Sequence, residues 1–361
     1  MTALKDKILR LVEAAGPMSV ADYMAICLFD PEHGYYTTRE PFGRGGDFTT
    51  APEISQMFGE LVAAWIYAAW RACGAPRRAV IAEIGPGRGT LMKDMLRTLG
   101  RFDAGFLSGQ RFALIETSSR LVDVQRKTLA GTEASLEWYS DVKDLPEGAL
   151  FIIGNELFDA LPIRQYVKTG SGWRERVVGE SGGELTFLAG AGAPDPALLP
   201  ANTDNAPVGA IVELSPARTA LMDIIAERLA RTDGAGLFID YGYATPALGD
   251  TLQALRRHTS DDVLAHPGEA DLTAHVDFSA LGKTARGHGL AARVMPQGDF
   301  LLGLGLLERA GRLGAGKTPN EQERISGEVE RLAGPEEMGT LFKALAVTPS
   351  TVTVPPFTLA D

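Results

Sequence analysis

Three glycines at every second position follow a short apolar run, and this turn limits the possible folds more than any other stretch. The run is Val80-Ile81-Ala82-Glu83-Ile84, and the glycines are Gly85, Gly87 and Gly89. An apolar run of this length is typical of a buried strand, and glycines after it mark a backbone that turns sharply or approaches another group closely. A helical pattern over residues 89–99 completes a strand–turn–helix unit. The stretch therefore predicts an α/β fold with a ligand-binding turn.

Two departures from the dinucleotide fingerprint indicate which ligand this turn binds. The fingerprint G-x-G-x-x-G requires a glycine where this chain has Thr90. Glu83 places a carboxylate beside the turn, and its charge would repel the pyrophosphate of a nicotinamide cofactor. S-adenosylmethionine carries a sulfonium and an ammonium group instead, which a carboxylate helps to neutralise. The pattern E-x-G-x-G-x-G resembles motif I of class I S-adenosylmethionine-dependent methyltransferases; the alternative is an ordinary turn of another α/β protein.

Composition and charge argue against several classes of protein. The chain has 361 residues, of which 45% are hydrophobic and 22% charged, so we expect a globular core with additions rather than disorder. The formal net charge of -11 argues against a nucleic-acid partner, because phosphate contacts need a cationic surface. No apolar stretch has the length of a membrane span.

Cysteine usage and the first residues suggest a compartment. Cys27 and Cys73 lie far apart and form no C-x-x-C motif, and none of the five histidines is grouped with them, so we expect no metal site. A reducing cytoplasm is the default for such a chain. The first residues mix acidic and basic side chains, unlike a secretory or transit peptide, so we expect a bacterial cytoplasmic protein. The sequence does not give the oligomeric state.

The pattern along the chain predicts a Rossmann-like sheet with additions. Strands are expected at residues 79–84, 111–116, 135–139, 149–154 and 236–240, with helices near 89–99 and 118–130. This alternation is typical of a parallel sheet with helices on both faces. Residues 163–189 predict an antiparallel meander, and residues 350–354 predict a last strand.

The domain organisation follows from where this alternation begins and breaks. We expect an N-terminal helical lobe over residues 1–75 and a methyltransferase core over residues 76–361. The core would carry insertions at residues 161–214 and 241–289, after the fourth and fifth core strands. Residues 311–340 predict a charged helical excursion whose role the sequence leaves open.

Acidic residues end two strands beyond the glycine turn. Ligands of an open parallel sheet bind beyond the carboxyl ends of its strands, so these residues are candidates for the methyl donor's site. The Glu116 carboxylate can accept both ribose hydroxyls, or it can cap the helix that begins near Ser118. Asp141 can accept from the adenine amino group, or it can be a solvated turn aspartate.

The loop after the fourth strand supplies candidates for the acceptor side. Glu156 and Asp159 could clamp a guanidinium or another cationic nucleophile. A guanidinium nitrogen is a poor nucleophile because its lone pairs are delocalised, so a carboxylate that localises the charge and takes a proton would assist methyl transfer. The alternative is that Asp159 caps a turn and Glu156 is an ordinary surface acid.

An N-terminal loop offers further donor contacts. Gly46 could donate a backbone N–H group to the donor's carboxylate, with Asp47 binding its ammonium group and Thr49 beside them. The alternative for Thr49 is a capped loop that enters a helix. His33, Tyr35 and Tyr36 could line an acceptor channel. His275 receives no role.

Several long runs together resemble one family, the MidA-like methyltransferases. These runs are residues 29–36 (FDPEHGYY), 45–56 (GGDFTTAPEISQ), 83–89 (EIGPGRG), 155–162 (NELFDALP), 240–242 (DYG) and 271–278 (DLTAHVDF). The resemblance implies a class I fold and S-adenosyl-L-methionine as the methyl donor. For mitochondrial members, which are complex I assembly factors, it implies dimethylation of an arginine on a core subunit of that complex.

Three functions are therefore compared. A protein arginine methyltransferase, acting on a protein such as a complex I subunit, is the leading hypothesis. The others are a non-catalytic assembly chaperone on the same fold and a small-molecule methyltransferase. The intact glycines and Glu116 argue against the chaperone, and an enclosed apolar pocket would favour a small molecule.

Overall fold

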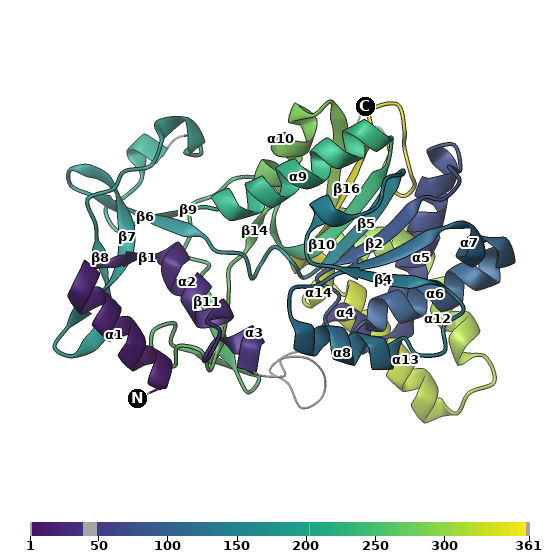
Figure 1. Ribbon diagram of the computed structural model, residues 1–361, viewed down its shortest axis with the longest axis horizontal. Coiled ribbons are helices and arrows are strands. Elements are labelled where there is room, and N and C mark those ends of the chain that lie inside the picture. The colour runs from purple at the N-terminus through teal and green to yellow at the C-terminus, as the bar shows by residue number, and fades with distance from the viewer. Residues whose placement is uncertain (1, 39–48, 202, 359–361) are drawn as a thin grey trace. The chain divides into compact units, whose positions relative to one another are not determined.

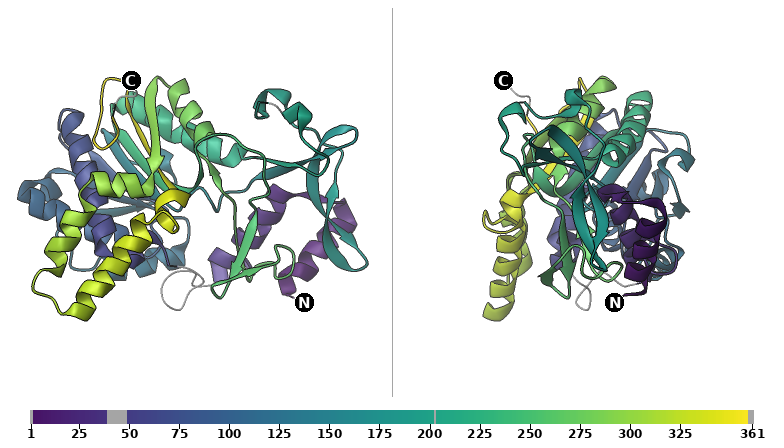
Figure 2. Two further views of the ribbon diagram at one scale, coloured as in Figure 1. Left: turned by 180° about the vertical axis from the view of Figure 1, so that it is seen from behind. Right: turned by 90° about the vertical axis from the view of Figure 1, so that its left-hand side faces the viewer.

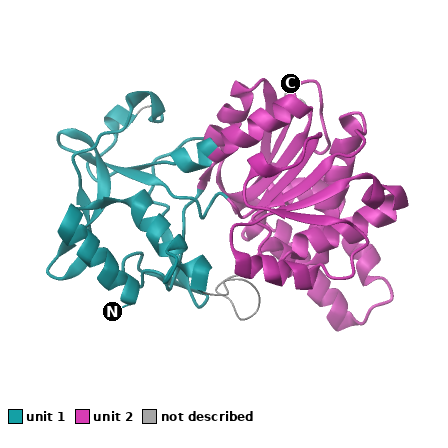
Figure 3. Cartoon of the chain, viewed as in Figure 1, with its two compact units in different colours: residues 1–48, 158–220, 245–275 teal, residues 49–157, 221–244, 276–361 magenta. Residues whose placement is uncertain are grey.

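The computed structural model describes residues 2–38, 49–201 and 203–358, and the chain divides into two compact units (Figure 3). Unit 1 comprises residues 1–48, 158–220 and 245–275, and unit 2 comprises residues 49–157, 221–244 and 276–361. This division differs from the predicted boundary at residue 75, because the helix of residues 56–72 belongs to unit 2 and both insertions contribute to unit 1. Within the described residues, no helix has the length and apolar character needed to span a membrane.

Unit 2 is built on a mostly parallel sheet (Figure 1). Its strands follow the order β15-β16-β10-β5-β2-β3-β4, and β14 pairs with β10. Along this path β16 runs antiparallel to both β10 and β15, and the pairs from β10 to β4 are parallel. The predicted core strands are confirmed as β2 (Val80–Ile84), β3 (Arg111–Ile115), β4 (Leu136–Tyr139), β5 (Leu150–Asn155) and β10 (Ala235–Tyr243). The strand order reverses beside β2, which places a ligand-binding switch point at its carboxyl end.

Apolar residues alternate between the two faces of this sheet. On one face, Ile81, Ile153 and Leu237 join a buried cluster with α5 (Gln56–Ala72) and α6 (Thr90–Phe102). On the other face Gly236 leaves room for α9 (Pro216–Thr232), since a Cβ there would lie 3.2 Å from Leu229 Cδ1. Unit 2 also contains α4 (Ala51–Ile54), α7 (Ala104–Gly109), α8 (Ser119–Thr128) and α10 (Phe278–Gly287), with the 3₁₀ turn η1 (Val142–Asp144). The predicted doubly covered α/β sheet is confirmed.

Near the C-terminus, the structure differs from the prediction at one strand. The last strand is β16 (Phe342–Pro349), and the predicted strand at residues 350–354 is wrong, since these residues follow β16 as a turn and irregular chain. The β-branched residues of 350–354 favour a strand, but the continuous apolar run Ala344–Val347 occupies the buried position between β10 and β15 (Leu290–Pro296).

The predicted helical excursion lies between β15 and β16. The predicted residues 311–340 cover the end of α12 (Leu306–Gly314), all of α13 (Pro319–Ala333) and most of α14 (Met338–Leu341), and α11 (Gln297–Gly303) precedes them. Its long helices are yellow-green in the view from behind (Figure 2). Ile325 and Leu332 of α13 are buried in the same cluster as α5, so the excursion covers part of the core rather than projecting freely.

Unit 1 combines three separate stretches of chain. The meander is confirmed as β6 (Arg164–Thr169), β7 (Gly172–Ser181) and β8 (Glu184–Ala189), to which β9 (Ile211–Leu214) adds beside β6. The N-terminal strand β1 (Met18–Ser19) pairs with β7, with Met18 opposite Val178. The N-terminal helices are α1 (Ala3–Ala15), α2 (Val20–Phe29) and α3 (Tyr35–Thr38), and the short turns are η2 (Pro196–Leu198) and η3 (Thr203–Asn205). The N-terminal lobe and first insertion therefore share one sheet.

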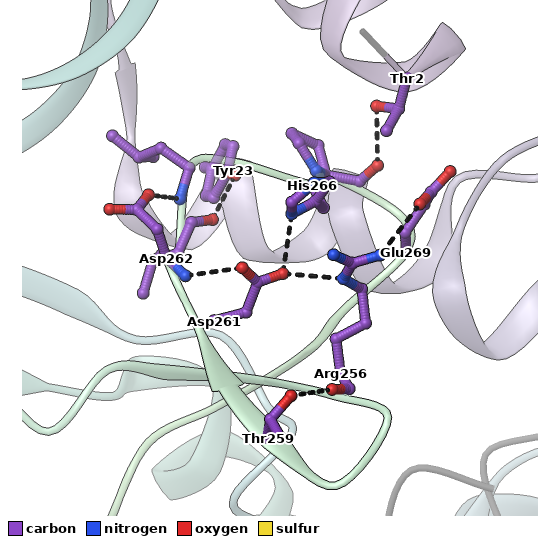
Figure 4. A network of polar contacts seen from close by, with 11 residues as sticks. Thr2, Tyr23, Arg256, Thr259, Asp261, Asp262, His266 and Glu269 are labelled. Atoms are coloured by element: carbon purple, nitrogen blue, oxygen red, sulfur yellow. Dashed lines mark hydrogen bonds and ion pairs between the residues drawn. The ribbon is translucent and has the colours of Figure 1, made fainter.

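The second insertion completes unit 1. Residues 241–289, predicted as an insertion, contain the small sheet β12-β11-β13 (Thr259–Asp261, Gln253–Arg256, Asp271–Thr273), as well as β14 (Val276–Asp277) and α10 in unit 2. Figure 4 shows how the loop after β12 is held: the Tyr23 hydroxyl donates to the Val263 carbonyl (2.7 Å), and the Thr2 hydroxyl to the Pro267 carbonyl (3.1 Å). The Asp261 carboxylate binds Arg256 and His266, at 3.0 and 2.8 Å.

Candidate active site

The glycine turn has the left-handed backbone conformation that its composition predicts. Gly85, Gly87 and Gly89 all have positive φ angles, of +67°, +51° and +80°. This left-handed region is open to glycine and costly for residues with a Cβ. A Cβ at Gly85 would also lie only 3.0 Å from Leu157 Cδ1. Gly89 ends the turn as the N-cap of α6, so the turn leads directly into a helix N-terminus.

Glu83 lies under this turn rather than on the surface of the site. Its side chain is 3% exposed, and burial raises the pKa of its carboxyl group to about 8. The carboxylate accepts from the backbone N–H of Met92, in the first turn of α6, which partly offsets that rise. Its Oε2 atom has no hydrogen-bond partner among the described residues. The predicted contact of Glu83 with the donor stays a prediction.

Glu116 stands at the end of β3, as predicted. Its Oε1 accepts from the Ser118 N–H (2.8 Å), and its Oε2 accepts from Gln125 Nε2 (3.1 Å). Burial raises the pKa of its carboxyl group, and these bonds oppose the rise. The helix cap is Ser118 itself, whose hydroxyl oxygen accepts from the Leu121 N–H, so Glu116 is not the N-cap residue.

A pocket of about 550 Å³ opens beside Glu116. Its lining residues come from the ends of β3 and β4 and from α8: Glu116, Thr117, Ser119, Val122, Asp123, Arg126, Trp138, Tyr139 and Ser140. The pocket combines a carboxylate with the flat Trp138 ring, over which Arg126 lies at 5.0 Å. A carboxylate beside an aromatic wall suits a nucleoside, which has ribose hydroxyls and a flat base.

Asp141 is exposed and does not line this pocket. Its Oδ1 accepts from the Lys143 N–H (2.9 Å) and caps η1. The geometry matches the turn-aspartate alternative, and the predicted adenine contact stays a prediction.

Gln125 is a residue that the sequence interpretation missed. Its fully buried amide donates to the Gly87 carbonyl (2.9 Å) as well as to Glu116, and accepts from Trp138 Nε1 (2.9 Å). It therefore joins the glycine turn, the end of β3 and the wall of the pocket. The signal was present in the sequence, since a glutamine stands between Leu121 and Leu129 in the apolar stripe of a helix.

Glu156 directly follows β5 in a strained conformation. Its φ angle is +50°, which is uncommon for a residue with a Cβ. Its Oε1 accepts from the Ala51 N–H and from Asn155 Nδ2, both at 3.1 Å. The next residue, Leu157, donates its N–H to the buried Asp240 carboxylate at 3.1 Å. Glu156 is thus fixed within unit 2 and is not an ordinary surface acid.

The segment of residues 49–56 also reaches the glycine turn. Glu53 in α4 accepts from the Thr90 hydroxyl (2.5 Å), and its carboxylate lies 3.9 Å from the Arg88 guanidinium. Thr49 is half-buried just before α4. Gly46 and Asp47 lie outside the described residues, so their predicted donor contacts stay predictions.

Asp159 belongs to unit 1, while Glu156 belongs to unit 2. Its side chain is buried, and its carbonyl accepts from Arg218 Nη2 (3.0 Å) and from the Ala274 N–H (3.1 Å). Burial raises the pKa of the Tyr36 phenol well above its ordinary value, and the carboxylates of Asp271 and Asp159 raise it further. Asp159 is therefore part of an acidic and aromatic cluster rather than a simple turn cap.

His275 has a structural position in unit 1. Its N–H donates to the Thr251 hydroxyl oxygen (2.9 Å), and its carbonyl accepts from Arg218 Nη1 (2.6 Å). These backbone contacts give no reason to assign it a chemical role.

Comparison with known proteins agrees with a methyl-donor site. Residues 61–295 match the model of a family described as S-adenosyl-L-methionine-dependent methyltransferases. The mouse mitochondrial protein arginine methyltransferase NDUFAF7 is 33% identical, over 97% of this chain and 85% of its own length. The Drosophila melanogaster homologue is 36% identical, over 96% and 84%. A Burkholderia thailandensis crystal structure with bound S-adenosyl-homocysteine is 28% identical, covering 98% of this chain and 93% of that one, with a TM-score of 0.84.

Proposed function

The chain belongs to the S-adenosyl-L-methionine-dependent methyltransferases, and we propose that it methylates an arginine side chain of a protein. The observation that carries the proposal is identity of 33–36% across nearly the whole chain with proteins named as protein arginine methyltransferases. A complex I subunit is the proposed protein substrate, and the bacterial cytoplasm the proposed compartment.

The proposed donor site uses the carboxyl ends of β2, β3 and β4. The positive-φ turn of Gly85, Gly87 and Gly89 lets the backbone approach the amino-acid part of the donor closely, and Glu116 accepts the ribose hydroxyls. The proposal also includes Glu83 near the donor's ammonium, Asp141 toward the adenine, and Gly46, Asp47 and Thr49 beside the donor's carboxylate. The residues suit this group, because the pocket combines a carboxylate with an aromatic wall.

The bound donor supplies an electrophilic methyl group on a sulfonium. Transfer of that group needs an in-line approach of the acceptor nitrogen, so the chain's main task is to position the acceptor. We propose that Glu156 binds the acceptor guanidinium and localises its positive charge on the nitrogens that do not react. A carboxylate can then take the proton that the methylated nitrogen loses. Asp159 is proposed as a second acid for the acceptor.

The test is to compare methylarginine in proteomes of cells with and without this protein, by mass spectrometry. A peptide that loses its methylarginine, and regains it on incubation with purified protein and S-adenosylmethionine, would identify the substrate. Glu156→Gln should reduce that activity by roughly 10²–10⁴-fold. It should leave donor binding unchanged, because the amide keeps an acceptor for the Ala51 N–H. Donor binding without any loss of methylarginine would instead favour a small-molecule acceptor.

A further inference from the structure

Gln125 is a buried polar side chain that neither the glycine turn nor the acidic residues explain. It lies in α8 with an exposed fraction of 0%, between the buried side chains of Leu121 and Leu129. An apolar residue at this position would continue the stripe, and burying an amide is costly unless all its polar atoms are hydrogen-bonded. The hydrogen bonds of Gln125 therefore indicate why an amide stands there.

The partners of Gln125 allow only one orientation of its amide. Nε2 donates to the Gly87 carbonyl (2.9 Å) and to Glu116 Oε2 (3.1 Å), and both of these oxygens only accept. Oε1 accepts from Trp138 Nε1, at 2.9 Å, and an indole N–H only donates. A flipped amide would lose all three bonds, so the side chain is fixed.

The partners also come from three strand ends. Gly87 lies in the turn after β2, Glu116 ends β3, and Trp138 is in β4. A Cβ at Gly89 would lie 3.6 Å from Gln125 Cα, so α8 packs directly against the turn. Gln125 itself is not among the residues that line the pocket beside Glu116.

We infer that Gln125 is a positioning residue for the methyl donor: it holds the Gly87 turn, the Glu116 carboxylate and the Trp138 wall in one fixed arrangement. This inference rests on the proposed donor site at these strand ends. Gln125 does not touch the donor. By donating to one Glu116 oxygen, it sets the direction in which the carboxylate faces a ribose.

The test is to titrate the purified chain with S-adenosyl-homocysteine and to measure binding by calorimetry and by tryptophan fluorescence. Gln125→Met keeps the volume and removes all three bonds, and Gln125→Glu keeps the shape and removes both donors. We expect both variants to bind at least about tenfold more weakly than the parent chain at pH 8. The matched control is Gln297→Met, which removes another fully buried amide of unit 2, one that donates to the Leu332 carbonyl (2.8 Å). This control should bind normally.

The pH dependence of binding distinguishes a positioning role of Gln125 from a role in packing alone. In Gln125→Glu two carboxyl groups face each other, and below neutral pH they can share a proton that restores one donor. Relative to the parent chain, the affinity of this variant should therefore recover as pH falls from 8 to 5, whereas that of Gln125→Met should not. If Gln125→Met does not fold, the pH dependence of binding by Gln125→Glu still tests the positioning role of Gln125.

Each outcome has one meaning. Parent-like affinity in both Gln125 variants, or a flat Gln125→Glu profile relative to the parent, would overturn the positioning role while leaving the donor site intact. Absence of binding by the parent chain would instead refute the proposed donor site. If Gln297→Met bound S-adenosyl-homocysteine as weakly as the Gln125 variants, a general loss of stability would explain the weaker binding, and the positioning role would be refuted.

Discussion

Single residues of the donor turn are constrained by backbone geometry more than by side-chain chemistry. All three glycines have positive φ angles. A Cβ at Gly85 would also lie within contact distance of Leu157. Spacing alone made these residues predictable. The bonds of Gln125 were not, because they depend on the tertiary arrangement of three strands. The sequence therefore predicted the conformation of this turn, but not the side chain that holds it beside Glu116 and Trp138.

Gly85→Val should abolish binding of S-adenosyl-homocysteine, or weaken it by at least about tenfold. The branched side chain must occupy a left-handed backbone conformation and displace Leu157 from the turn. Gly131→Val is the matched control, because Gly131 has a φ of +81° and no atom within 4 Å of a Cβ. Calorimetric titration should show normal binding for the control. Equal loss in both variants would mean that strain alone, and not the site, explains the result.

Glu83 should make the stability of the chain depend on pH. Its carboxyl pKa is about 8 in the folded chain against an ordinary 4.5, so the folded state holds a proton that the unfolded state has released. The contribution of Glu83 to the free energy of unfolding must then fall as pH rises from about 4.5 to 8, by up to ~1.4 kcal/mol per pH unit. Glu83→Gln removes this dependence. Denaturant unfolding at pH 5 and pH 8 measures the free energy of unfolding of both chains. The free energy of the variant should rise relative to that of the parent chain as pH rises. An equal difference between the two chains at both pH values would contradict the raised pKa.

At the scale of elements, strands with strong patterns were predictable and the C-terminal strand pair was not. β2, β3, β4 and β5 are each flanked by clear turns or helices, and each was predicted within two residues. β16 has Lys343 near its start and a run without alternation, because both of its faces are buried. From the local pattern alone, the neighbouring β-branched residues 350–354 therefore resembled a strand more than the residues of β16 did.

Helix α13 has an end that can be tested independently of the site. Thr318 and Glu321 form a capping box, in which the hydroxyl oxygen accepts from the Glu321 N–H and the carboxylate accepts from the Thr318 N–H. Thr318→Ala should lower the melting temperature by roughly 2–4 °C. Binding of S-adenosyl-homocysteine should not change, since neither residue lines the pocket beside Glu116. Thr318→Ser, which keeps the cap, should melt like the parent chain, and weakened binding in Thr318→Ala would link the excursion to the donor site.

At the scale of the whole molecule, unit 1 is assembled from stretches that are far apart in the sequence. Its core joins Leu4 and Ile8 of α1, Val178 of β7 and Leu272 of β13. The sequence predicted the lobe and the insertions as separate additions, because a two-residue strand such as β1 carries no pattern. Pairing between Met18 and Val178 spans about 160 residues and is invisible to local analysis. We infer that these three stretches fold as one cooperative body.

Ile8→Ala tests that cooperativity. Ile8 is fully buried in the shared core, so its truncation should destabilise unit 1 by about 2–5 kcal/mol. Leu11→Ala is the control on the same helix, because Leu11 is 41% exposed. Hydrogen exchange followed by mass spectrometry should show faster exchange in α1, in β7 and in the β11–β13 sheet together, whereas the control should exchange like the parent chain. Faster exchange confined to α1 would mean that the N-terminal helix opens alone and that the two insertions keep each other folded without it.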